Sequence, residues 1–80
     1  MLELYQFESC PYCRRVREKL SELEIDYIAR NVRIGTPKWK EFSALNPNEQ
    51  VPFLVDPDRG VSMEESAEII GYLERVYGKN

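Results

Sequence analysis

The chain has 80 residues, 11 of them basic and 14 acidic, which gives a formal net charge of −3. Hydrophobic residues make up 42% and charged residues 31%, a balance typical of one small globular domain and not of a disordered or collagen-like chain. The excess of acidic residues argues against nucleic acid as a partner. No apolar run is long enough for a membrane span, and the first ten residues lack the features of a signal peptide, so we expect a cytosolic protein with no membrane partner.

Residues 2–7 (LELYQF) form an apolar-rich run that predicts a strand. A helix follows, because Pro11 suits a first helical turn. Its apolar stripe recurs at spacings of three, four and three residues and consists of Cys13, Val16, Leu20 and Leu23. Cys13 therefore lies on the buried stripe and Cys10 just before the helix, so we expect Cys10 to be the accessible thiol and Cys13 the shielded one.

The second half of a β-α-β unit comes next. Residues 24–32 (EIDYIARNV) are rich in β-branched and aromatic residues and predict a strand parallel to the first. Residues 35–46 predict a helix, with Thr36 as its cap and Pro37 at its first position. The apolar residues of that helix are spaced three apart and are Trp39, Phe42 and Leu45.

Residues 51–56 and 60–63 predict a hairpin, because the turn signal Pro57, Asp58, Arg59 and Gly60 separates them. Residues 63–78 predict a last helix that stops at Gly78. Its apolar face consists of Ile69, Ile70, Leu73, Val76 and Tyr77. The predicted order is β-α-β-α-β-β-α, and since no linker or repeat interrupts it, we expect one α/β domain over residues 1–80.

The chain has two cysteines, spaced as Cys10-x-x-Cys13, and no histidine. In a reducing cytosol such a pair indicates redox chemistry, and a zinc site would lack two of its four usual ligands, so no metal is expected. The nucleophile is the thiolate, and an ordinary cysteine is only about 3% ionised at neutral pH. The helix start can stabilise the Cys10 anion, and positive charge follows at Arg14, Arg15 and Arg17, although a solvated basic face explains these arginines equally well.

The tetrapeptide CPYC at residues 10–13 resembles the active site of dithiol glutaredoxins, which implies a thioredoxin-like fold with a four-stranded mixed sheet flanked by three helices. The resemblance implies catalytic roles for Cys10 and Cys13, with Cys13 resolving disulfides formed on Cys10. The stretch QVPFL resembles the segment in which a cis proline, here Pro52, faces the thiols and the backbone of Val51 pairs with glutathione. Tyr12 would shape the glutathione groove, whereas the residues expected in the core or on the ordinary surface are Tyr5, Tyr27, Tyr72 and Trp39.

The stretch MEESAEIIGYL departs from glutaredoxins and, with NPNEQVP upstream, is similar to the amino-terminal domain of glutathione transferases. That resemblance implies that Glu65 and Ser66 bind the γ-glutamyl end of glutathione. The sequence supports a capping box equally well, with Ser62 at the N-cap and Glu65 three residues on. The lysine that many glutaredoxins carry before the first cysteine is absent, since that region holds Gln6 and Glu8. Candidate partners for the glycine-end carboxylate are Arg14, Lys38 and Arg33.

These resemblances imply a monomeric, glutathione-dependent thiol–disulfide oxidoreductase. Glutathione would be its co-substrate, and its substrates would be protein disulfides and glutathionylated proteins. Two other functions stay open. One is a redoxin reduced by thioredoxin reductase, although the tail motif Trp-Ser-Gly-Phe is absent. The other is a metal or iron–sulfur cluster carrier in which two chains each supply Cys10, although proline after the first cysteine argues against it within the family.

Overall fold

The computed structural model describes residues 1–78 and contains the predicted elements in the predicted order. These elements are β1 (Leu2–Gln6), α1 (Pro11–Glu22), β2 (Tyr27–Asn31), α2 (Pro37–Leu45), β3 (Phe53–Asp56), β4 (Val61–Glu64) and α3 (Ser66–Tyr77). Within residues 1–78, none of the helices is both long and apolar enough to cross a membrane.

The four strands form one mixed sheet in the order β2-β1-β3-β4. Strand β1 runs parallel to β2 and antiparallel to β3, and β3 and β4 form the predicted antiparallel hairpin. The parallel pair is possible because α1 carries the chain back across one face of the sheet. The predicted α/β architecture with a four-stranded mixed sheet is thereby confirmed.

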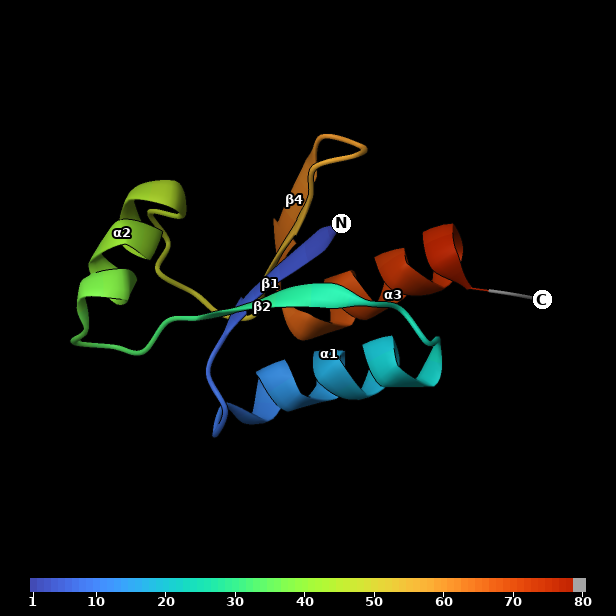
Figure 1. Cartoon of the computed structure of the whole chain (residues 1–80), viewed down its shortest axis with the longest axis horizontal. Coiled ribbons are helices and arrows are strands. Elements are labelled where there is room, and N and C mark those ends of the chain that lie inside the picture. Colours follow the sequence, from blue (N-terminus) through green and yellow to red (C-terminus); the bar gives the residue numbers. More distant parts are fainter. Residues whose placement is uncertain (79–80) are drawn as a thin grey trace.

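Each face of the sheet has its own core, because successive side chains of a strand point to opposite faces. Leu4 and Leu54 pack against α1 and α3, which lie side by side along one face (Figure 1). On the other face Tyr5 and Phe53 pack against Phe42 of α2. Of the helices in residues 1–78, only α2 covers this second face, and Leu45, an expected member of its apolar stripe, is 50% exposed.

The predicted second strand is too long by three residues at its start, because the end of α1 occupies them. Glu24 has a φ of 56°, and the backbone N–H of Ile25 donates to the carbonyl of Leu20 at 2.9 Å. The N–H of Glu24 donates to Ser21, which completes a Schellman motif in which glutamate takes the place usual for glycine. This motif ends the helix, and β2 begins only at Tyr27.

The predicted last helix begins three residues too early. Strand β4 continues to Glu64, which pairs with Phe53, so α3 starts only at Ser66. Ser62 lies inside the strand and is not the N-cap, and the predicted capping box is therefore wrong. In contrast, the Thr36 cap of α2 is confirmed, since its Oγ1 accepts a hydrogen bond from the N–H of Trp39 at 3.2 Å.

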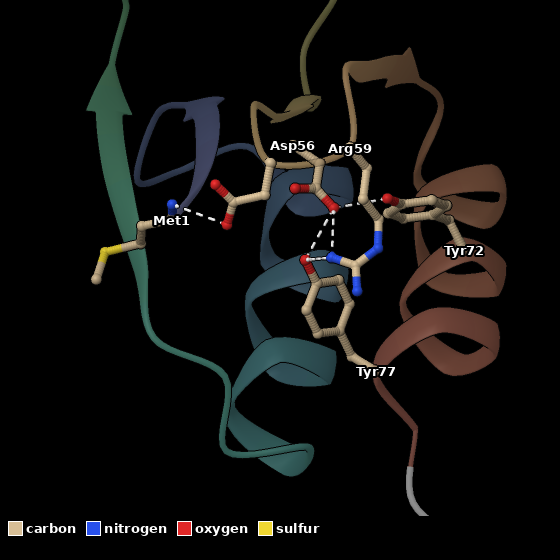
Figure 2. Close-up of polar contacts among 6 residues, drawn as sticks. Met1, Asp56, Arg59, Tyr72 and Tyr77 are labelled. Atoms are coloured by element: carbon tan, nitrogen blue, oxygen red, sulfur yellow. Dashed lines mark hydrogen bonds and ion pairs between the residues drawn. The ribbon is translucent and has the colours of Figure 1, made fainter.

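A buried carboxylate joins the hairpin to α3 at the end of the sheet away from the cysteines. Asp56 is fully buried, and its Oδ2 accepts hydrogen bonds from the hydroxyls of Tyr72 at 2.6 Å and Tyr77 at 2.8 Å (Figure 2). The Arg59 guanidinium lies 3.5 Å from the same oxygen and 4.9 Å from the centre of the Tyr77 ring. Burial acts to raise the pKa of the Asp56 carboxyl, but the two tyrosine hydrogen bonds and the Arg59 charge outweigh it and lower that pKa.

Candidate functional site

The sheet topology brings three separate parts of the chain to one edge. Strand β1 ends there at Gln6, and the chain continues through a short loop into α1. Strand β3 is antiparallel to β1, so it begins at the same edge, where Phe53 pairs with Tyr5. Strand β4 ends there in turn, at Glu64. Three segments therefore meet, as the order of elements requires. They are the loop of residues 7–10, called the cysteine loop below, the segment before β3 and the start of α3.

Both cysteines are held by the first turn of α1. Cys10 is the N-cap residue, and its Sγ accepts a hydrogen bond from the backbone N–H of Cys13 at 3.2 Å. The carbonyl of Cys10 accepts the first helical bond, from Arg14 at 3.0 Å, while its own N–H donates to Phe7 at 3.2 Å. A sulfur in this position replaces the oxygen of an ordinary N-cap and receives the positive end of the helix dipole. The first turn of α1 thus presents a backbone donor to the Cys10 sulfur.

The expectation that Cys10 is the exposed thiol needs correction, because both cysteines are buried. Cys10 is 5% exposed and Cys13 is 0% exposed. The N-cap geometry is the physical reason, since it turns the Cys10 sulfur back over the first helical turn. The predicted shielding of Cys13 is confirmed. Burial, followed by a hydrogen bond with the Cys10 side chain, raises the pKa of the Cys13 thiol to about 12, so that this thiol is protonated at neutral pH.

The arginines of α1 do not act as one basic cluster. Arg14 pairs with Glu18 along the exposed face of the helix at 3.3 Å, which fits the solvated basic face allowed above. Arg17 turns toward the cysteine loop and donates to the carbonyls of Phe7 at 3.4 Å and Glu8 at 3.1 Å. Its positive charge also acts to lower the pKa of Cys13, against the larger effect of burial. Arg17 thus fastens the loop that leads to Cys10.

A groove of about 250 Å3 lies beside the cysteine loop. Its lining consists of Tyr12, Gln50, Val51, Pro52, Glu65, Ser66 and Ala67. Five of the predicted binding residues are therefore brought together, and the peptide bond before Pro52 is cis, as the resemblance implied. Arg14, the sixth predicted binding residue, is not among the lining residues. Gln50 and Ala67 were not predicted from the sequence, although each directly adjoins a residue that was.

Glu65 occupies a strained position at the start of α3. Its φ is 76°, in a region that non-glycine residues rarely adopt and that costs on the order of 1–3 kcal/mol. Glu65 is the N-cap of α3, but its side chain makes no capping hydrogen bond. The carboxylate is therefore not occupied with stabilising the helix. Strained residues of this kind cluster at ligand sites, which makes Glu65 a candidate binding residue.

A second groove, of about 460 Å3, lies on the β2 side of the cysteine loop, and Phe7 and Glu8 contribute to its wall. Arg33 and Lys38, two candidates for an anionic ligand group, also line it. The Arg33 guanidinium lies 5.9 Å from the centre of the Phe7 ring. Arg33 and Lys38 thus bring positive charge to a groove that Phe7 and Glu8, on the chain before Cys10, also line.

The end of β1 carries a buried polar contact that the sequence reasoning missed. Gln6 is 3% exposed, and its Nε2 donates to Asn31 Oδ1 at 2.6 Å, while Arg17 donates to its Oε1. Gln6 and Asn31 face each other as the last residues of two parallel strands. The sequence signal that could have revealed this contact is a glutamine at the end of an apolar strand.

Over residues 1–78, no three His, Cys, Asp or Glu side chains form a group that could hold a metal ion.

These features define a small α/β domain in which a cysteine pair at a helix start lies beside a groove containing a cis proline, an arrangement typical of thioredoxin-like proteins. Residues 4–80 match the family described as the glutathione S-transferase N-terminal domain, and the chain belongs to that family. The transferase part of the resemblance is thereby confirmed. The dithiol redox activity implied by the glutaredoxin part is taken up below as a proposal.

Proteins of this family from different organisms are similar in sequence to nearly the whole chain. The chain is 30% identical over 79 residues to the glutathione S-transferase-like protein OpS6 of Beauveria bassiana, covering 99% of this chain and 36% of that protein. It is 36% identical over 78 residues to glutathione S-transferase Z2 of Arabidopsis thaliana, covering 95% of this chain and 34% of that protein. The chain thus spans about a third of the length of the relatives it matches.

Solved structures of glutathione transferases superpose on nearly the whole of this chain. A glutathione transferase homologue from Drosophila mojavensis, determined with bound glutathione, superposes with a TM-score of 0.87 at 30% identity, covering 99% of this chain and 36% of that one. A glutathione S-transferase from the Antarctic clam Laternula elliptica superposes with a TM-score of 0.83 at 35% identity, covering 98% and 36%. The predicted thioredoxin-like architecture is the one that these structures share.

Proposed function

We propose that this chain binds glutathione in the groove beside Cys10 and acts as a glutathione-dependent thiol–disulfide oxidoreductase through Cys10 and Cys13. The observation that carries the proposal is the hydrogen bond from the Cys13 N–H to the Cys10 sulfur, which holds both thiols in one helical turn. Membership of the transferase family and the groove lined by Tyr12, Val51 and Glu65 support glutathione as the co-substrate.

Removing glutathione from a glutathionylated protein would need only Cys10. The Cys10 thiolate attacks the glutathione sulfur of the mixed disulfide, a new disulfide forms between Cys10 and glutathione, and the protein sulfur leaves as a thiolate that takes up a proton. A second glutathione thiolate then attacks the bound glutathione sulfur. Oxidised glutathione leaves, and Cys10 is regenerated. The protein sulfur is reduced and the sulfur of the incoming glutathione is oxidised, so the disulfide bond passes from the protein substrate to oxidised glutathione.

Reducing a protein disulfide would use Cys13 as well. Cys10 first forms a mixed disulfide with one substrate sulfur and releases the other as a thiol. Cys13 then attacks the Cys10 sulfur, which releases the second substrate thiol and leaves a Cys10–Cys13 disulfide for two glutathione molecules to reduce. The hydrogen bond with Cys10 and the charge of its thiolate both raise the Cys13 pKa, and both disappear in the mixed disulfide. Formation of the mixed disulfide therefore makes Cys13 easier to ionise at the step that needs it.

The test is a coupled assay with glutathione, glutathione reductase and two substrates, a small glutathione mixed disulfide and a protein disulfide. Cys10→Ser should abolish activity on both substrates. Cys13→Ser should keep most activity on the mixed disulfide and lose most on the protein disulfide, because a thiol held one turn away attacks far more often than dissolved glutathione. A folded Cys13→Ser protein that is inactive on both substrates would overturn the glutathione-dependent mechanism.

Family membership favours a second candidate, conjugation of glutathione to an electrophile. In that reaction the groove would activate the thiol of glutathione itself, and Cys13 would have no chemical role. The same preparations assayed with glutathione and an aryl halide distinguish the two functions. The transferase reaction would be assigned if Cys10→Ser still conjugated glutathione and the unsubstituted chain did not reduce disulfides.

We do not propose reduction by thioredoxin reductase or cluster transfer. A cytosolic, monomeric protein without a nucleic-acid or membrane partner remains our prediction.

A further inference from the structure

Three polar side chains connect the two walls of the groove. One wall consists of Gln50, Val51 and Pro52, and the other of Glu65, Ser66 and Ala67. Asn46 follows the last residue of α2 and is 6% exposed, and its Nδ2 donates to Glu64 Oε1 at 3.0 Å and to the carbonyl of Gln50 at 3.2 Å. Asn48 Nδ2 donates to the other carboxylate oxygen of Glu64, Oε2, at 2.9 Å. The backbone N–H of Asn48 also donates to Asn46 Oδ1 at 3.3 Å. Both carboxylate oxygens of Glu64 are therefore engaged.

The residues joined in this way directly precede the residues that line the groove. The loop of residues 46–50 leads into Val51 and Pro52, and Glu64 ends β4 immediately before Glu65 and Ser66. None of Asn46, Asn48 and Glu64 is itself among the lining residues. Their contacts set the position of one wall relative to the other.

Each wall also carries a strained residue next to this contact. Glu49 has a φ of 53° and Glu65 a φ of 76°, values that non-glycine residues rarely adopt. Such conformations persist only where the surrounding structure holds them in place. The hydrogen bond from Asn48 to Glu64 joins the two residues that directly precede Glu49 and Glu65, so it is placed to hold both conformations.

We infer that Glu64 is a positioning residue for glutathione binding: through Asn46 and Asn48 it fixes the spacing of the two groove walls and the conformation of Glu65. This inference rests on the proposed function, because the ligand is the glutathione assigned to the groove above. A ligand that must contact Val51 on one wall and Glu65 on the other gains affinity when their spacing is set before it binds. Glu64 acts on the ligand only through the wall residues.

The test compares Glu64→Ala, Glu64→Gln and a matched control, Glu68→Gln, which changes an exposed glutamate in the first turn of the neighbouring helix α3. Isothermal titration with glutathione should show a dissociation constant roughly tenfold higher for Glu64→Ala, the size of effect expected when charged hydrogen bonds are lost. Glu64→Gln should raise it roughly threefold, because the amide oxygen can still accept from Asn46. Glu68→Gln should not change it.

A rescue variant separates positioning from general stability. In Asn48→Asp combined with Glu64→Gln, the new amide can donate to the new carboxylate, so the contact is restored with its direction reversed. The dissociation constant for glutathione should return to within about twofold of the starting value, the coupling that a double-mutant cycle measures. A purely structural role would lower the urea midpoint of Glu64→Ala without changing glutathione affinity at concentrations where the variant is folded.

Hydrogen exchange of the unliganded chain supplies a readout that does not depend on glutathione. Glu64→Ala should increase exchange in residues 49–51 and 65–67 and leave residues 11–22 unchanged. If the unsubstituted chain fails to bind glutathione, the proposed function is wrong, and the exchange data alone then decide whether Glu64 fixes the walls. Unchanged exchange in both wall segments, or an unchanged dissociation constant in a chain that binds glutathione, would overturn the inference.

Discussion

Asp56 offers a quantitative test of how the domain is held together, because one buried carboxylate oxygen accepts two tyrosine hydrogen bonds and faces an arginine. Hydrogen bonds to a charged group contribute about 1.5–3 kcal/mol each, and a buried polar group left without a partner costs about 1–3 kcal/mol. In Asp56→Ala the hydroxyl of Tyr72, a residue only 7% exposed, loses its acceptor. We expect this substitution to lower the free energy of unfolding at pH 7 by about 3–4 kcal/mol, out of the roughly 5–15 kcal/mol usual for a domain.

The direction of the pH dependence follows from the pKa shifts. The folded-state pKa of Asp56 is lowered from its ordinary value of 3.8, so its stabilising contribution is complete above that value and is lost as the pH falls through the folded-state pKa. Burial, and then the bond to Asp56, raises the pKa of Tyr72 from 10.0 to about 12, so this contribution is complete below pH 10 and is lost as the pH rises toward 12. The network should therefore stabilise the fold most between about pH 4 and 10.

Urea denaturation of the unsubstituted chain, Asp56→Ala, Asp56→Asn and Asp58→Asn at pH 7 and pH 2.5 provides the assay. Asp58 is the matched control, since its side chain is 72% exposed and lies 3.5 Å from the amino terminus of Met1. The loss of unfolding free energy for Asp56→Asn should be large at pH 7 and smaller at pH 2.5, because the contribution of the charged carboxylate declines as the pH falls below its ordinary pKa of 3.8. The reasoning would be refuted if Asp56→Asn lost the same free energy of unfolding at both pH values. It would also be refuted if Asp56→Asn and Asp58→Asn lost the same free energy of unfolding at pH 7.

Three further outcomes are expected. Iodoacetamide at pH 6 should label Cys10 alone, because Cys13 is fully buried with a pKa near 12; equal labelling of both peptides by mass spectrometry would contradict this. Glu65→Gln with Ser66→Ala should raise the glutathione concentration needed for half-maximal rate several-fold while changing the urea midpoint little, since the Glu65 side chain makes no cap; unchanged glutathione dependence would remove both residues from the binding site. Thr36→Ala should cost about 0.5–2 kcal/mol of stability and leave glutathione affinity unchanged, as measured by urea denaturation and titration.

The order of elements could be predicted from the sequence because its signals are local. Pro11 and Pro37 both occupy first helical positions, and Thr36 caps as its side chain suggests. The convergence of the cysteine loop, Pro52 and Glu65 follows from that order once the strands pair as the hairpin and the β-α-β unit require. Residues at one edge of a sheet can thus be assigned to one site although more than 50 positions separate Cys10 from Glu65.

Side-chain burial and partner choice could not be predicted in the same way. The sequence places Cys10 outside the apolar stripe of α1, but its burial results from the direction in which an N-cap sulfur turns, which periodicity does not encode. The three arginines after Cys13 are equivalent by composition. Only the fold determines that Arg14 pairs with Glu18 on the surface and that Arg17 reaches the carbonyls of the cysteine loop.

The wrong prediction for the start of α3 concerns Glu64, the residue that we infer to position the two walls of the groove. In the sequence, Ser62 and Glu65 form an acceptable capping box, and Glu64 is then a helical residue with no special role. In the structure the pairing of Glu64 with Phe53 extends β4 by one residue beyond the predicted strand, and a shift of one residue would turn every side chain of the strand to the opposite face. The pairing therefore both presents the Glu64 carboxylate to Asn46 and Asn48 and leaves Glu65 to make the turn into α3 at a positive φ. The local capping signal fails here because the long-range pairing of Glu64 with Phe53 in the sheet takes precedence over it.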